Sequence, residues 1–167
     1  MEYQSENVKQ VQKESMKDWM AVCFYLGQQE FGIPIHQVKE IIVPRKITKV
    51  IYTPDIIEGV LNLRGIIVMV LNLKKIFDIP DNPNVEKNVV ILDNDGKNSG
   101  VLVDKIESVE RIERSKIEFF EEEKDQKKKL CEGVVQYDNH SLTLLNIANL
   151  LDLPEIHQFC GVTDAEG

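Results

Sequence analysis

Short runs of apolar residues, many of them β-branched, alternate with polar or glycine-containing turns between residues 19 and 154. Runs of this length are typical of strands, because an ordinary helix shows apolar residues spaced by three and four over ten or more positions. Helical spacing occurs only at residues 74–79 and 147–153, over one or two turns each. The pattern predicts a mainly β protein with short helices.

Three pairs of apolar runs lie close enough in the chain to form hairpins. The pairs are residues 21–27 with 31–35, residues 89–92 with 100–103, and residues 134–137 with 141–145. The connection at residues 93–96 has the sequence Asp-Asn-Asp-Gly, and Asn and Gly tolerate the positive φ angles of tight turns. We therefore expect each pair to be antiparallel.

An internal repeat groups these elements into two similar halves. Residues 58–80 and 132–154 align without a gap at an offset of 74, and seven of the 23 positions are identical. A fainter match joins residues 32–41 to residues 100–109 at an offset of 68. Each half thus contains a strand that starts at glycine, a strand after Glu-Gly-Val, another strand and a short helix.

Many short strands in two related sets predict two small barrels rather than one large sandwich. Each set of about 65 residues would bury little core alone, so we expect a shared apolar seam. The expected boundaries are a polar tail over residues 1–18, a first barrel over about 19–84, a second over about 85–154, and a tail over 155–167. The first strand either belongs to the first barrel or crosses into the second.

Composition and charge exclude several classes of partner. Of the 167 residues, 43% are hydrophobic and 29% charged, the balance of a folded globular protein, and the net charge is −8. A nucleic-acid groove needs a concentrated basic surface, and anionic lipid also attracts basic residues, so we expect neither nucleic-acid binding nor direct membrane insertion. The longest purely apolar run has six residues, and the first 18 residues contain no signal-like apolar core. These features predict a cytoplasmic protein.

The three cysteines, Cys23, Cys131 and Cys160, are too few and too dispersed for a disulfide framework or a CxxC metal site. Cys23 lies in an apolar run and is expected to be a small core residue. An odd, scattered set of thiols fits a reducing compartment.

Candidate catalytic groups are scarce. The three histidines, His36, His140 and His157, have no metal-ligand partner at the usual spacing, and neither an HExxH motif nor a glycine-rich phosphate loop occurs. The aspartates within residues 93–104 lack the spacing of a calcium loop, and the charged run at residues 121–129 is typical of a solvated loop. We expect no catalytic residue, metal ligand or cofactor.

The segment Asn62-Leu63-Arg64-Gly65 interrupts an otherwise apolar stretch with a charge and a glycine. Its counterpart in the second half, residues 136–139, is an ordinary polar turn. Arg64 and Gly65 are either simply the turn of a hairpin or, because an exposed Arg beside Leu has the composition of an interaction hot spot, part of a binding surface. The residues alone leave both interpretations open.

Four segments together resemble the CheW family of bacterial chemotaxis coupling proteins. They are FGIPI at 31–35, VKEI at 38–41, IEGVLNLRG at 57–65 and GVLVDKI at 100–106. The resemblance extends over residues 19–154 and implies two five-stranded, SH3-like β-barrels. It also implies a non-enzymatic adaptor that links the cytoplasmic tip of chemoreceptors (methyl-accepting chemotaxis proteins) to the regulatory domain of the histidine kinase CheA. Such an adaptor would be held at the membrane-associated array by its partners.

The resemblance also implies roles for particular residues. Those that match family positions for receptor or kinase contact are Val38, Glu40, Gly59, Asn62, Leu63, Arg64 and Gly65. Val101, Val103 and Val109 match positions expected in the seam between the barrels. Met69 and Asn72 depart from the family, which commonly has Pro and Asp there; at Met69 we expect a strand edge with altered pairing.

Two alternatives remain to be distinguished. The same module occurs in the regulatory domain of CheA and in CheV, but the end of this chain at Gly167 favours a free-standing adaptor. A small-ligand-binding or enzymatic barrel would instead need a deep polar pocket, for example one lined by His36, Glu40 and Arg64.

Overall fold

The computed structural model describes residues 18–94, 96–121 and 128–157. The strands are β1 (Trp19–Leu26), β2 (Gln29–Pro34), β3 (Val38–Ile42), β4 (Ile57–Leu63), β5 (Ile66–Asn72), β6 (Asn88–Asn94), β7 (Lys97–Val103), β8 (Ile106–Ile112), β9 (Ile117–Phe119), β10 (Cys131–Gln136) and β11 (Ser141–Leu145). The short helices are α2 (Leu73–Ile76) and α3 (Ile147–Leu151), with 3-10 turns η1 (Ile35–Gln37), η2 (Arg114–Lys116) and η3 (Lys128–Leu130). The mainly β class with short helices and the three hairpins are confirmed.

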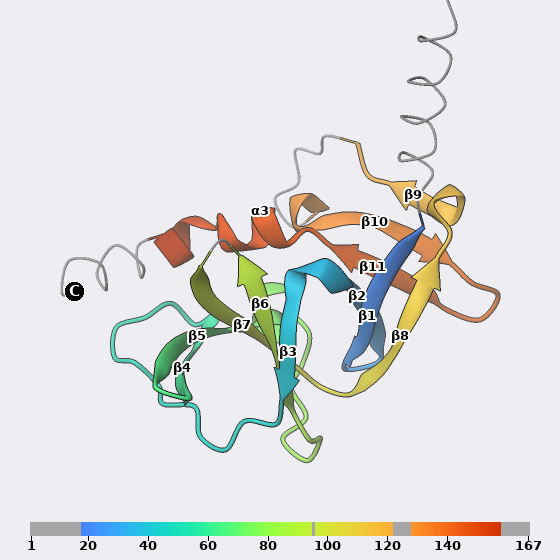
Figure 1. Cartoon of the computed structure of the whole chain (residues 1–167). Coiled ribbons are helices and arrows are strands. Elements are labelled where there is room, and N and C mark those ends of the chain that lie inside the picture. Colours follow the sequence, from blue (N-terminus) through green and yellow to red (C-terminus); the bar gives the residue numbers. More distant parts are fainter. Residues whose placement is uncertain (1–17, 95, 122–127, 158–167) are drawn as a thin grey trace, which may run out of the picture.

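The strands form two sheets that lie side by side as two SH3-like barrels (Figure 1). One sheet has the order β3-β6-β7-β5-β4 and the other β8-β1-β2-β11-β10-β9. The second sheet has six strands rather than the expected five, because the short β9 pairs with β10. In the first sheet the corresponding contact is a single bridge between Thr48 and Val60. We refer to the two units as the five-stranded and the six-stranded barrel.

The first hairpin of each half lies in the barrel of the other half. The β1–β2 hairpin joins the six-stranded barrel, where β1 pairs with β8 and β2 runs parallel to β11. The β6–β7 hairpin joins the five-stranded barrel, where β6 pairs with β3 and β7 runs parallel to β5. The expected boundary near residue 85 therefore does not separate the sheets, and the first strand crosses over. Because the two hairpins and their receiving strands are equivalent in the repeat, the exchange preserves every type of pairing.

The described residues form three apolar clusters. The interior of the five-stranded barrel contains Leu61, Val68, Val70, Val89, Ile91 and Leu102. The interior of the six-stranded barrel contains Ala21, Cys23, Ile112, Ile117, Val135, Leu142 and Leu144. The largest cluster lies between the barrels and draws on both, including Phe24, Phe31, Leu71, Val101, Val103 and Leu145. This cluster is the expected shared seam.

Two expectations about single residues are wrong. Val109 is 51% exposed, because it lies on the outward face of β8, whereas Val101 and Val103 belong to the seam. Met69 does not lie on a sheet edge, since β5 runs between β4 and β7.

Most of the expected tails, residues 1–17 and 158–167, lie outside the described residues, as do residues 122–127 of the charged run. Among the described residues, none of the helices has the length and apolar character needed to cross a membrane.

Candidate protein-interaction site

The segment around Arg64 forms the turn of the β4–β5 hairpin. Leu63 and Ile66 are paired, and the two residues between them have positive φ angles, 51° at Arg64 and 86° at Gly65. Tight two-residue turns of type I′ need positive φ at both central positions, which Gly tolerates and Arg does not favour. The Asn62 side chain supports the turn, because its Oδ1 accepts a hydrogen bond of 2.7 Å from the Gly65 N–H. The turn therefore holds an arginine outward at a position that suits a smaller residue.

The Arg64 side chain reaches across the barrel to Glu40. Its Nη2 lies 2.6 Å from Glu40 Oε2, and the side chains are 68% and 28% exposed. Glu40 lies on β3 and Arg64 follows β4, so the pair joins the two end strands of the five-stranded sheet. The hydrogen bond from Arg64 lowers the pKa of Glu40, and the same bond raises the pKa of Arg64. Both groups remain charged near neutral pH and accessible to a partner.

Gly59 has a structural position rather than an exposed one. It is buried at φ 150°, and a Cβ atom built on it would lie 2.2 Å from the carbonyl oxygen of Thr48. Its repeat counterpart Gly133 is equally crowded, since a Cβ there would lie 2.4 Å from the carbonyl oxygen of Glu118. Both glycines thus allow the preceding segment of the chain to approach the strand closely.

The remaining expected site residues are either half-buried in the apolar clusters or exposed beside Arg64. Val38 is half-buried against the seam, and Leu63 is half-buried against the interior of the five-stranded barrel. The structure brings four of the seven residues together on one exposed surface: Glu40, Asn62, Arg64 and Gly65. We call these four the Arg64 surface.

Exposed apolar residues flank the Arg64 surface, and the sequence pattern gave no sign of them. Ile66 and Ile67 follow the turn, and Ile41 and Val43 follow Glu40 in the chain; all four are exposed. Ile66 and Ile67 open an apolar run that is expected to be core, and only the hairpin register shows that they lie at its exposed end. Apolar residues around an exposed Arg are a composition typical of protein interfaces.

One group of side chains among the described residues could present three ligand atoms to a metal ion. Ligand atoms of Cys23, Glu30 and Glu110, on β1, β2 and β8 of the six-stranded barrel, lie within 4.8 Å of one another. Burial, together with the two carboxylates, raises the pKa of the Cys23 thiol to about 12, so the thiol keeps its proton near neutral pH. Glu30 Oε2 lies 3.2 Å from His140 Nε2, and Glu110 Oε1 accepts a hydrogen bond from Ser108. These contacts account for the carboxylates, and we assign no ion to them.

A cavity of about 380 Å³ lies between β1, β2 and β11 of the six-stranded barrel, away from the Arg64 surface. Its lining residues are Tyr25, Gln28, Gln29, Glu30, His140, Ser141 and Thr143. The residues that would have indicated a ligand-binding barrel, His36, Glu40 and Arg64, do not line it. The small-ligand interpretation therefore gains nothing from this cavity.

The fold and the Arg64 surface define the class of protein: a module of two fused SH3-like barrels with an exposed, arginine-containing hairpin turn. The family model of the CheW-like domain matches residues 20–155, and the chain belongs to this family. The crystal structure of scaffolding protein TtCheW from Thermoanaerobacter tengcongensis is similar, with a TM-score of 0.74 and 28% sequence identity. The match covers 83% of this chain and 96% of TtCheW. A search of curated proteins gave no match.

Proposed function

We propose that this chain is a chemotaxis adaptor that couples chemoreceptors to the histidine kinase CheA in signalling arrays. Membership of the CheW-like family and the similarity to a protein described as scaffolding support this function. The adaptor performs no reaction and needs no cofactor. It works in the cytoplasm, held at the array by its partners.

The observation that carries the proposal is the exposed Arg64 at the tip of the β4–β5 hairpin. The corresponding position of the second half is Asp138, so the barrel does not need an arginine there to fold. An arginine in the left-handed region also makes the turn less favourable, and such departures occur most often at functional sites. Arg64 is therefore available for binding.

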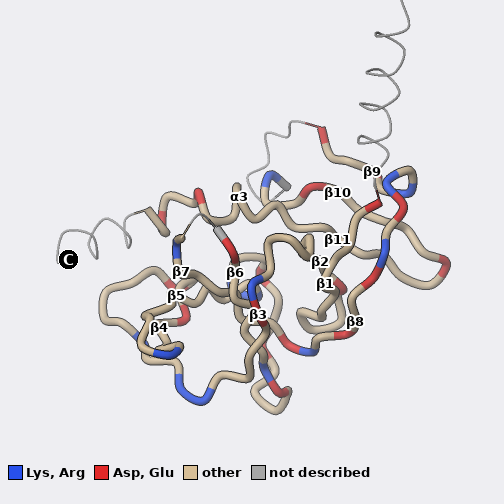
Figure 2. Tube along the Cα trace, in the orientation of Figure 1, with Lys and Arg blue, Asp and Glu red and all other residues tan. Residues whose placement is uncertain are grey.

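We place the receptor on the Arg64 surface and the kinase on another surface of the barrels. The β3–β4 loop carries three exposed basic residues, Arg45, Lys46 and Lys49, on a chain with a net charge of −8 (Figure 2). This local positive charge would attract an acidic receptor tip. An adaptor holds two partners at once, so several modest interfaces combine through effective concentration.

Arg64→Ala tests the proposal. A solvent-exposed ion pair contributes little to stability, so we expect a melting temperature within about 2 °C of the wild type. Binding to a purified receptor cytoplasmic fragment, measured by calorimetry, should weaken at least about tenfold, while binding to the CheA regulatory domain should stay unchanged.

Arg111→Ala is the matched control. Arg111 Nε lies 2.7 Å from Asp18 Oδ2, with side chains 74% and 27% exposed, so it forms a similar ion pair on the six-stranded barrel. We expect it to bind both partners as the wild type does. Unchanged receptor binding by Arg64→Ala, or loss of its fold, would rule out the site. Failure of the wild type to bind either partner would rule out the adaptor function.

A further inference from the structure

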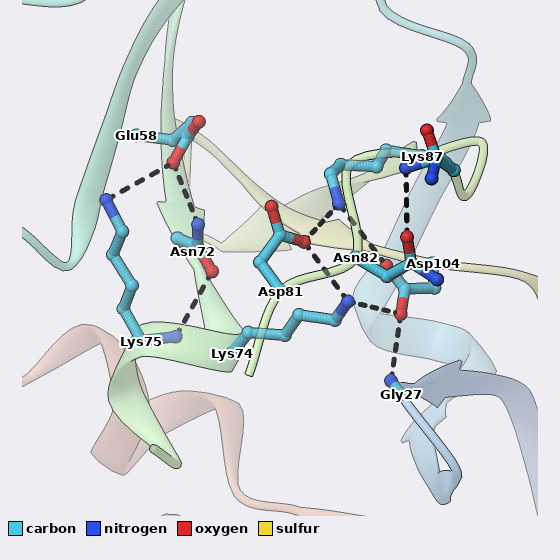
Figure 3. A network of polar contacts seen from close by, with 10 residues as sticks. Gly27, Glu58, Asn72, Lys74, Lys75, Asp81, Asn82, Lys87 and Asp104 are labelled. Atoms are coloured by element: carbon cyan, nitrogen blue, oxygen red, sulfur yellow. Dashed lines mark hydrogen bonds and ion pairs between the residues drawn. The ribbon is translucent and has the colours of Figure 1, made fainter. Parts of the chain in front are cut away.

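A buried ion pair lies where the two barrels meet. Lys74 Nζ is 2.7 Å from Asp104 Oδ2, and both side chains are only 5% exposed (Figure 3). Lys74 lies on α2, directly after β5 of the five-stranded barrel. Asp104 lies in the two-residue connection that leads from β7, in the five-stranded barrel, to β8, in the six-stranded barrel. Burying two charges costs solvation free energy unless the geometry and the remaining hydrogen bonds are favourable. The pair therefore calls for an explanation beyond packing.

Asp104 also holds the tip of the exchanged β1–β2 hairpin. Its Oδ2 accepts a hydrogen bond of 2.8 Å from the Gly27 N–H. The backbone repeats the attachment: the Asp104 N–H donates to the Tyr25 carbonyl at 3.0 Å, and the Tyr25 N–H donates to the Lys105 carbonyl at 2.8 Å. The connection between the barrels is thus joined to a hairpin of one barrel and, through Lys74, to a helix of the other.

Two further charges balance the pair. Lys74 Nζ lies 3.2 Å from Asp81 Oδ1, and Lys87 contacts Asp81 and lies 3.7 Å from Asp104 Oδ1. Burial alone would lower the pKa of Lys74, but hydrogen bonds to Asp104 and Asp81 outweigh it and raise this pKa. The hydrogen bond from Lys87 lowers the pKa of Asp81. Lys74 and Asp81 therefore stay charged at neutral pH, and the two lysines match the two aspartates.

The repeat shows that a barrel of this type folds without such a pair. The counterpart of Lys74 in α3 is Ala148, at the offset of 74, and the counterpart of Asp104 is His36, at the offset of 68. His36 and Ala148 are both exposed, and neither can form this ion pair. The pair is thus specific to one of the two connections between the barrels.

We propose that Lys74 and Asp104 are positioning residues that fix the orientation of the five-stranded barrel relative to the six-stranded barrel. The apolar seam holds the barrels together, but hydrophobic contact is not directional. Charge-assisted hydrogen bonds are directional, so they select one rotation among those that the seam permits. The consequence for signalling rests on the proposed adaptor function: the pair sets the spacing between the receptor-binding and kinase-binding surfaces.

Residual dipolar couplings of the backbone amides, measured on the full chain without partners, test the proposal. In the wild type, one alignment tensor should fit the couplings of both barrels. The variant Lys74→Met/Asp104→Leu removes both charges and leaves no buried unpaired ion. We expect each barrel to fit its own tensor, the common fit to be lost, and the Gly27 amide to exchange at least about tenfold faster. Lys75→Met is the control, because Lys75 is exposed on the same helix and only approaches Glu58 at 4.0 Å.

A double variant whose couplings still fit the wild-type tensor would show that the seam alone sets the orientation, and would overturn the proposal. If that variant does not fold, Asp104→Asn gives the same comparison, since it keeps the side-chain shape and an acceptor for Gly27 while weakening the ion pair. An unchanged orientation of the barrels in Asp104→Asn, or unfolding of both variants, would also overturn the proposal. Because no partner is present, a negative result refutes the positioning role and leaves the adaptor function standing.

Discussion

Gly59→Ala should destabilise the protein strongly, although the change adds a single methyl group. The new Cβ would lie 2.2 Å from the Thr48 carbonyl oxygen and 2.8 Å from the Thr48 carbonyl carbon, so the backbone must move. Thr48 and Val60 exchange two backbone hydrogen bonds of 2.8 Å, and these are the contacts that a shift would break. The expected damage is therefore local to the bridge that attaches the β3–β4 loop to β4.

The structure gives the magnitude. A non-glycine residue held in a sparsely populated backbone region costs about 1–3 kcal/mol, and φ at Gly59 is 150°. Loss of two backbone hydrogen bonds costs about 1–3 kcal/mol more. We expect a loss of about 2–6 kcal/mol in the free energy of unfolding, a large part of the roughly 5–15 kcal/mol of a typical domain. Urea denaturation followed by circular dichroism measures it.

Two other glycines separate strain from crowding. Gly65→Ala places a methyl at φ 86° with no atom within 4 Å, so we expect only the strain cost of about 1–2 kcal/mol. Gly133→Ala meets the Glu118 carbonyl oxygen at 2.4 Å but has no positive φ, so it isolates crowding. If Gly59→Ala costs no more than Gly65→Ala, the close approach to Thr48 does not constrain the fold and the reasoning fails.

Three further predictions concern polar groups that are buried or half-buried. Asn72→Asp should lower the free energy of unfolding by about 1–2 kcal/mol, because Asn72 Nδ2 donates a hydrogen bond of 2.8 Å to Glu58 Oε2 and an aspartate carboxylate cannot donate it. Adding Glu58→Gln should restore stability, as measured in denaturant titrations. Burial raises the pKa of Glu30 in the folded protein, so the contribution of Glu30 to stability is complete at low pH and is lost as pH rises through that pKa. The free energy of unfolding of Glu30→Gln should therefore rise relative to that of the wild type from about pH 4 to neutral pH. A difference between the two proteins that does not change with pH would refute this. Burial raises the pKa of Cys23 to about 12 and of Cys131 to about 11, so Ellman's reagent at pH 8 should modify them far faster in urea than in the native protein.

The strands and the two halves were predictable because they depend on local pattern. Alternating apolar runs and turn residues mark hairpins within a few residues, and an ungapped repeat marks equivalent elements. The exchange of hairpins was not predictable, because β2 could pair equally well with β5 or with β11 as far as side chains indicate. In the structure β2 lies in one sheet, and β3, which follows it after η1, lies in the other.

The candidate site was predictable only in part. Arg64 and Gly65 stood out as a charge and a glycine within an apolar stretch, but the contact with Glu40 joins residues 24 positions apart. Gly59 belongs to the same motif and carries a different role, since the close approach of Thr48 arises from tertiary structure. A motif therefore marks a region of importance without separating its exposed residues from its structural ones.

The repeat separates these roles physically. Positions that are identical in both halves perform the same structural task twice: Gly59 and Gly133 admit a neighbouring carbonyl, and Asn72 and Asn146 each cap a short helix through the side-chain oxygen. A task that recurs in both barrels is a requirement of the barrel itself. Substitution at these positions should therefore act on stability first.

Positions that differ between the halves at equivalent places follow the opposite logic. Arg64 aligns with Asp138 and Lys74 aligns with Ala148, yet apart from the added β9 both barrels pair their equivalent strands in the same order. The barrel therefore tolerates either residue, and the charge present in one copy alone must be explained by something that the two barrels do not share. For Arg64 that is an exposed surface open to a partner, and for Lys74 it is the buried junction with Asp104. Comparing the two halves thus distinguishes, within a single chain, residues that build the scaffold from residues that adapt it to a task.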